Sequence, residues 1–144
     1  MYLLDTNVIS AVAPTKASID FALVEWIRKS SSRLFLSVVT ASEVGRGVAK
    51  LEREGRRQKA EALRRWWGQI EHHYSRRLLE FDLKASHAAG MIMDRARGHA
   101  PGYQDIALAA TASVHGLTVL TANERHFSPL GVDFLNPFKA LPPL

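Results

Sequence analysis

The chain has 144 residues, which suits one ordinary domain with a single hydrophobic core. It contains no cysteine, so disulfide bonds and zinc–thiolate sites are excluded, and no apolar run approaches the roughly 18 residues that a membrane-spanning helix needs. The formal net charge of +5, concentrated in arginines and lysines between residues 50 and 77, suits a polyanionic partner, although a solvated helix face also accounts for such charges.

Hydrophobic periodicity divides the chain into strands that alternate with helices. Short apolar runs such as the opening MYLLD are typical of buried strands, whereas apolar residues that recur every three to four positions indicate helices with one packed face. Because helices connect the strands, we expect right-handed crossovers and a mainly parallel sheet with helices on both faces. The expected elements, in chain order, are strand 1–5, helix 18–29, strand 34–39, a helix from Thr40 to Gly55, helix 56–75, strand 77–81, helix 83–97, a helix from Asp105 to Gly116, strand 117–121 and strand 132–135.

The sequence predicts a single continuous domain over residues 1–144. No internal repeat, low-complexity tract or linker interrupts the pattern, so the expected fold is α/β with a sheet of four to five strands. Residues 139–144 are expected to be a peripheral tail. An apolar stripe from Ala60 to Tyr74 predicts packing between helices or between subunits. The opening MYLL is too short for the apolar core of a secretory signal, so we expect a cytoplasmic protein.

Four oxygen-bearing side chains fall where strands end or helices begin. Asp5 ends the first strand and Glu43 follows the second, while Asp105 opens a helix and Asn123 follows strand 117–121. Sites in parallel sheets form beyond the carboxyl ends of the strands, so these side chains are expected at one rim. Close carboxylates raise one another's pKa, and a hard divalent cation such as Mg²⁺ or Mn²⁺ removes that repulsion. Such a site suits hydrolysis of a phosphodiester bond in a nucleic acid.

Each of these residues also has a purely structural explanation. Thr40-Ala-Ser-Glu43 is a capping box in which Glu43 would bond back to the Thr40 amide, so capping and metal chemistry both remain open for Glu43. Asp105 suits the N-cap of its helix, and Asn123 is a typical turn residue. Asp5 could cap the turn that follows it, but a carboxylate that ends an apolar strand is costly without a partner, which favours a functional role.

Several segments of the sequence resemble those of one protein family. They are Leu-Leu-Asp5-Thr6-Asn7 at the start, Ser-Glu43-Val after the second strand, Asp105-Ile-Ala-Leu-Ala-Ala-Thr-Ala, and Leu-Thr-Val-Leu-Thr121-Ala-Asn123-Glu-Arg-His-Phe127. Together they resemble PIN-domain proteins and, more narrowly, the VapC toxins of bacterial toxin–antitoxin pairs, including the FitB-like branch. The resemblance extends from Met1 to about Phe138.

This resemblance implies a PIN-like domain that acts as a Mg²⁺- or Mn²⁺-dependent endoribonuclease on tRNA or rRNA and inhibits translation. Asp5 and Asp105 match the family's metal carboxylates, and Glu43 matches its second acid. Asn123 stands where many members have a fourth acid, and its neutral amide leaves the number of metal ions open. We therefore expect these four residues to be catalytic, with Asp5 and Asp105 as metal ligands. Expected partners are RNA, a VapB-type antitoxin and a second copy in a homodimer, without a membrane.

Two other functions compete with this one. Phosphatases of the haloacid-dehalogenase kind also place an aspartate at the end of the first strand, but they need a second aspartate two residues later, where this chain has Asn7. The other alternative is a catalytically weak or inactive PIN-like module that binds RNA or protein. It remains open because Asn123 carries no charge and Glu43 has a capping role available.

Overall fold

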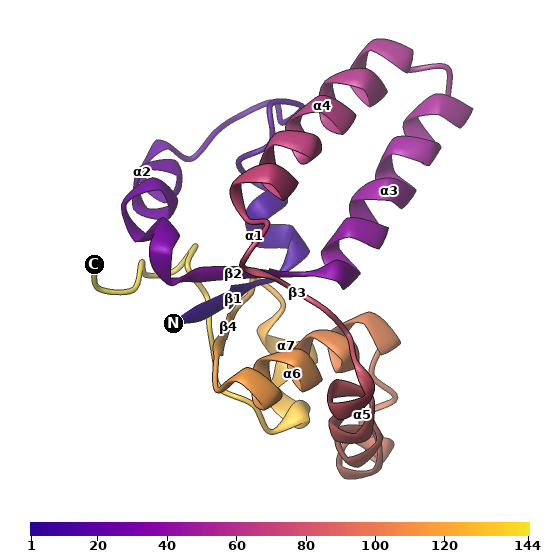
Figure 1. Cartoon of the computed structure of the whole chain (residues 1–144), viewed down its shortest axis with the longest axis vertical. Helices are drawn as coiled ribbons and strands as arrows, with labels where there is room; N and C mark the ends of the chain where they lie inside the picture. Colours follow the sequence, from indigo (N-terminus) through magenta and orange to yellow (C-terminus); the bar gives the residue numbers. More distant parts are fainter.

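A parallel sheet of five strands, in the order β3–β2–β1–β4–β5, forms the centre of the protein (Figure 1). The computed structural model describes all residues from Met1 to Leu144. Because β1 is central, its carboxyl end lies between those of β2 and β4, with which it pairs. The expected parallel sheet with intervening helices is confirmed. The strands are β1 (Tyr2–Leu4), β2 (Leu34–Ser37), β3 (Leu78–Leu79), β4 (Thr118–Leu120) and β5 (Phe134–Leu135).

Helices cover both faces of this sheet, and each face has its own hydrophobic core (Figure 1). Alternate residues of a strand point to opposite faces. Leu3 and Val119 therefore pack with α5 and α6, whereas Leu4 and Leu120 pack with α1, α2 and α4. The helices are α1 (Thr6–Ser10), α2 (Phe21–Ser30), α3 (Val38–Arg53), α4 (Arg57–His73), α5 (Leu83–Arg95), α6 (Tyr103–His115) and α7 (Glu124–Phe127), with 3₁₀ turns at Ser31–Arg33, Arg97–His99 and Ser128–Leu130.

The apolar stripe of α4 packs inside the molecule. Ala60, Trp67 and Tyr74 are all buried, and the last two belong to the core cluster on the α1–α4 side of the sheet. The expected packing between helices is confirmed, and α3 is the neighbour that α4 contacts most extensively. The apolar residues of this stripe therefore pack against other helices of the same subunit.

Two helices begin before the residues expected to open them. The helix α3 begins at Val38 because the Ser37 hydroxyl accepts a hydrogen bond from the Val39 amide at 3.1 Å, so Ser37 is the N-cap. The helix α6 begins at Tyr103, two residues before Asp105. Its expected end is confirmed, because Gly116 adopts a left-handed φ of 62° that a glycine tolerates without strain.

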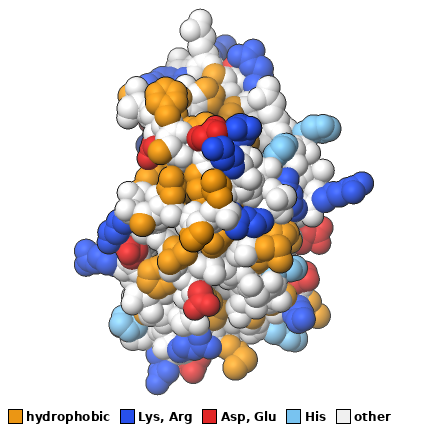
Figure 2. Space-filling model, turned by 90° about the vertical axis from the view of Figure 1, so that its left-hand side faces the viewer, with side chains coloured by type: hydrophobic (Ala, Val, Ile, Leu, Met, Phe, Trp, Pro, Cys, Tyr) orange, Lys and Arg blue, Asp and Glu red, His pale blue; other side chains and the backbone are white.

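The C-terminal segment 139–144 has no helix or strand and lies beside α2. Its Pro142 is buried, and the Pro142 carbonyl accepts a hydrogen bond from the Trp26 indole at 2.6 Å. Figure 2 views the side of the molecule that carries α2 and both termini, where hydrophobic side chains are interspersed with charged ones. No helix has both the length and the apolar character required to span a membrane.

Candidate active site

Asp5 lies directly after β1 and is held by three hydrogen bonds. Its Oδ1 accepts from the Thr6 amide at 2.7 Å, which makes Asp5 the N-cap of α1. Its Oδ2 accepts from the Asn7 side-chain amide at 2.7 Å and from the Thr121 hydroxyl at 2.6 Å. The residue is only 5% exposed. The carboxylate at the end of the central strand is therefore fixed in position by its neighbours.

Thr121, directly after β4, joins the ends of the two central strands. Its buried hydroxyl donates to Asp5 and accepts from the Asn123 amide at 2.9 Å. A second connection runs beside it, because the Asn7 side-chain oxygen accepts from the Ala122 amide at 3.0 Å. The turn that follows β4 is consequently tied to the residues that follow β1.

Glu43 lies on α3 and has no capping role. The capping-box hypothesis is wrong because Ser37, rather than Thr40, caps this helix. Thr40 instead lies inside the first turn, where its buried hydroxyl accepts a hydrogen bond from the Thr6 hydroxyl at 3.2 Å. Glu43, one helical turn later, is partly buried and lines a polar pocket. Because helix capping does not occupy the Glu43 carboxylate, it can act in this pocket.

Asp105 lies in the first turn of α6 rather than at its N-cap, which is Gly102. The capping interpretation of Asp105 is therefore wrong. The Asp105 side chain is 19% exposed, and its Oδ2 lies 3.1 Å from Nδ1 of His126 on α7. The His126 ring therefore contacts a candidate catalytic acid.

Asn123 immediately precedes α7, and its side chain forms no capping hydrogen bond with that helix. The side chain lines the same pocket as Glu43 and Asp105. Its backbone is held by Thr121, as described above. An amide at this position supplies hydrogen-bonding groups without adding negative charge.

A pocket of about 500 Å³ brings three of the four expected residues together. None of its lining side chains is hydrophobic. Asp5 lies buried beside this pocket, next to the lining residue Thr6. The lining residues are Thr6, Glu43, Arg46, Gly47, Lys50, Gln104, Asp105, Asn123 and His126.

The carboxylates of the site interact electrostatically. Burial raises the pKa of Asp5, and the charge of Asp105 raises it further, against the lowering effect of the hydrogen bonds to Asp5. Burial also raises the pKa of Glu43, with additional contributions from the charges of Asp5 and Asp105. The Thr6 hydroxyl and the Arg46 guanidinium act in the opposite direction on Glu43. The site therefore accumulates negative charge that its own cations do not fully compensate.

This charge is of the kind that a divalent cation neutralises. No three His, Cys, Asp or Glu side chains are arranged closely enough to form a complete protein metal site. Mg²⁺ commonly binds through only one or two carboxylates and keeps several waters, so it does not require such a group. Oxygen ligands without cysteine suit Mg²⁺ or Mn²⁺. The donor set therefore fits a hard, partly hydrated cation.

Thr6, Asn7 and Thr121 were not among the residues singled out for the site. All three follow the central strands directly and bind Asp5, either through a side chain or through the backbone. A polar residue at the end of an apolar strand is the sequence signal that they share with Asp5. The contact between Thr121 and Asp5 spans 116 residues, so local periodicity contains no information about it.

Comparisons with known proteins agree with this fold. The PIN domain family matches residues 2–131. The chain is 35% identical over 142 residues to the VapC ribonuclease Y4jK of Sinorhizobium fredii, covering 96% of this chain and 99% of the relative. It is 33% identical over 147 residues to the plasmid stability protein StbB of Pseudomonas syringae pv. tomato, covering 97% and 100% of the two chains.

Solved structures give the same result. The structure of FitAcB from Neisseria gonorrhoeae contains a chain that superposes with a TM-score of 0.82 at 31% identity, covering 96% of this chain and 99% of the other. FitAB bound to an IR36 DNA fragment contains a chain that matches with a TM-score of 0.75 at 28% identity, covering 96% of both chains. The sequence profile, the relatives and the fold therefore lead to one conclusion: this chain belongs to the PIN-domain family.

Proposed function

We propose that this protein is a Mg²⁺- or Mn²⁺-dependent endoribonuclease and the toxin of a type II toxin–antitoxin pair. The observation that carries the proposal is the meeting of Glu43 and Asp105 in one polar pocket beside the buried Asp5. The name VapC ribonuclease of one relative supports RNA cleavage. The proposed substrate is tRNA or rRNA, and its cleavage would inhibit translation.

In this mechanism the residues divide the work of phosphodiester hydrolysis. Asp5 and Asp105 would hold the cation, which when bound stabilises charge on the phosphoryl oxygens and lowers the pKa of water. The hydrogen bonds from Thr6, Asn7 and Thr121 keep the Asp5 oxygens oriented. The Glu43 carboxylate lines the pocket and does not cap its helix, which suits a general base. Asn123 positions substrate or water through its amide.

The proposed partners follow from the same relatives. Several solved structures with this fold are toxin–antitoxin complexes, among them VapBC from Salmonella typhimurium at 26% identity and a TM-score of 0.68. A VapB-type antitoxin would bind this chain and block the polar pocket. A homodimer is also proposed. Both partners would act in the cytoplasm, where the RNA substrate is found.

The direct test is RNA cleavage by the purified protein with Mn²⁺ and with EDTA. We expect Asp5→Ala and Asp105→Asn each to lower the cleavage rate about 10³-fold, because each removes a proposed metal carboxylate. The matched control is Asp94→Asn, which removes an exposed carboxylate of α5 that pairs only with Arg97. Metal-stimulated cleavage that survives Asp5→Ala would contradict the proposal.

A cellular experiment tests the toxin assignment separately. Expression without an antitoxin should slow growth, Asp105→Asn should relieve that effect, and sequencing of RNA ends should identify the cleaved tRNA or rRNA. If the wild-type protein binds RNA but does not cleave it with either cation, the binding-module alternative is favoured instead.

A further inference from the structure

The catalytic pocket continues into two neighbouring cavities. A cavity of about 480 Å³ shares Gln104, Asp105 and His126 with the catalytic pocket. A third cavity, of about 690 Å³, in turn shares His99, Arg125 and Pro129 with that second one. The three cavities therefore lie next to one another, from the catalytic pocket beside α3 to the third cavity beside α7. The third cavity is called the outer pocket here and is lined by His99, Glu124, Arg125, Ser128, Pro129 and Phe134.

The outer pocket has an uncompensated positive charge. Arg125 is exposed and pairs with no carboxylate of the chain. Glu124 is the only acid of this pocket, and it is already paired with Lys139 and accepts a hydrogen bond from the Asn136 amide at 3.1 Å. These two contacts lower the pKa of Glu124 and satisfy its carboxylate. Arg125 is therefore left free to bind an anion.

Cationic side chains also line the catalytic pocket, beside its acids. Arg46 and Lys50 lie one turn apart on α3, line the catalytic pocket and form no ion pair. Cationic side chains thus line both the catalytic pocket, which contains the acids, and the outer pocket. Such an arrangement suits a polyanion that contacts both pockets.

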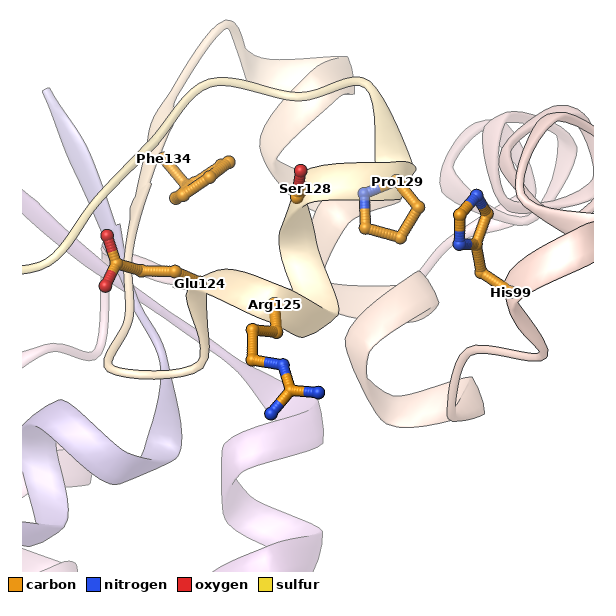
Figure 3. A pocket seen from close by; sticks show the side chains of 6 residues that line it. All are labelled: His99, Glu124, Arg125, Ser128, Pro129 and Phe134. Carbon is orange, nitrogen blue, oxygen red and sulfur yellow. The ribbon is translucent and has the colours of Figure 1, made fainter.

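The walls of the outer pocket combine this charge with apolar surface. Figure 3 shows Glu124 and Arg125 leaving α7 in different directions, with Phe134 on one side of Ser128 and Pro129, and His99 on the other. Phe134 is half-buried and packs against the core that contains α5 and α6. A guanidinium binds a phosphate, and an aromatic or proline ring offers an apolar face to a base. A nucleotide presents both groups.

We infer that the outer pocket binds a nucleotide of the RNA strand that flanks the scissile phosphate. Arg125 contacts the phosphate of that nucleotide, and Phe134 and Pro129 contact its base. This inference rests on the proposed ribonuclease function and extends it, because it gives the strand a path from Arg46 across the acids to Arg125. The strand is single-stranded RNA, whose bases are free to be stacked outside a duplex.

The test measures binding of a fluorescein-labelled single-stranded RNA of about 12 nucleotides in EDTA, which prevents metal-dependent cleavage during the titration. We expect Arg125→Gln to weaken binding about five- to tenfold. The slope of log K against log salt should become shallower by about 0.7, the value for one phosphate contact with a single strand. Arg125→Lys should recover part of the affinity, because it restores the charge without the planar guanidinium.

Arg76→Gln is the matched control, because it removes an equally exposed arginine before β3, at the opposite edge of the sheet. It should bind the RNA like the wild-type protein. The inference is overturned if Arg125→Gln retains wild-type affinity and salt slope, if Arg76→Gln loses as much affinity, or if Arg125→Gln weakens only antitoxin binding.

Cleavage of the same RNA with Mn²⁺ tests the proposed function separately. Cleavage without dependence of binding on Arg125 contradicts the outer pocket alone, whereas Arg125-dependent binding without cleavage contradicts the nuclease proposal alone.

Discussion

The two aspartates proposed to bind metal are held in very different ways. Asp5, at the end of β1, is buried and accepts three hydrogen bonds from residues that follow β1 and β4. Asp105, on the first turn of α6, is more exposed, and the one hydrogen bond of its side chain is with His126. The His126 side chain is itself 63% exposed. One side of the site is therefore fixed by buried contacts, and the other lies at an open rim.

This difference indicates how the site tolerates its own charge. A buried carboxylate needs hydrogen bonds in place of water, and Asp5 receives them from the protein. Asp105 keeps access to solvent, which screens its repulsion with Asp5 and Glu43. In the proposed mechanism, the fixed acid would set where a cation binds, and the more exposed acid could adjust to it. The following three predictions address this contrast.

The largest effect is expected from Thr121→Val, which removes one of the contacts that hold Asp5 in place. The valine is nearly isosteric but leaves the Asn123 amide without its acceptor and removes one hydrogen bond from Asp5. We expect a loss of about 1–3 kcal/mol in the free energy of unfolding, measured by urea denaturation. The cleavage rate should fall about 10- to 100-fold, because Asp5 loses its orientation.

Thr111→Val separates these two effects. Thr111 is also buried, but its hydroxyl donates to the Ala107 carbonyl of its own helix at 2.8 Å, away from the acids. The free energy of unfolding of the Thr111→Val variant should change, while its cleavage rate should stay close to that of the wild type. Equal loss of activity in both variants would mean that Thr121 acts through stability alone and that the fixed side has no special role.

The second prediction concerns the metal. If Asp5 and Asp105 hold a cation, Mg²⁺ or Mn²⁺ at ten times its Kd should stabilise the folded protein by about 1.4 kcal/mol. For a chain of this length, that corresponds to an increase in Tm of roughly 3–6 °C. Asp5→Asn should abolish this increase in a thermal scan with and without the cation. An undiminished increase in Asp5→Asn would place the cation elsewhere.

The smallest effect on stability is expected from Glu43→Gln. Because the folded-state pKa of Glu43 is raised, the folded protein binds its proton more tightly than the unfolded chain does. Wild-type stability therefore falls, relative to Glu43→Gln, as the pH rises from about 4 through the folded pKa. The difference should level off at less than about 1 kcal/mol near neutral pH, because Glu43 is only partly buried.

Glu25→Gln provides a control of opposite sign. The Arg28 guanidinium lowers the pKa of Glu25 to about 2, so its ionised form favours the folded state. The wild type should therefore gain stability relative to Glu25→Gln as the pH rises from about 2 through the unfolded pKa near 4. If both variants show the same direction of pH dependence, the raised pKa of Glu43 is contradicted.

Much of the fold and site could be predicted because it is encoded locally. The apolar runs specified the strands, and Asp5 was recognised from its position at a strand end. The helices α1 and α7 were missed because each is too short to show a 3.6-residue period. The start of α3 was misplaced because Ser37 and Thr40 are both good caps, and only the end of β2 decides between them. The Thr121–Asp5 contact depends on the pairing of β1 with β4.

That contact also sets the order in which the candidate site is completed during synthesis. Asp5 leaves the ribosome before its partner Thr121, which follows 116 residues later. The strand β1 has β4 as one of its two neighbours, so the centre of the sheet closes only after β4 has emerged. A nascent or truncated chain that ends before β4 therefore lacks the Thr121 contact that orients Asp5. Local folding of the first strand alone is not enough to assemble the site.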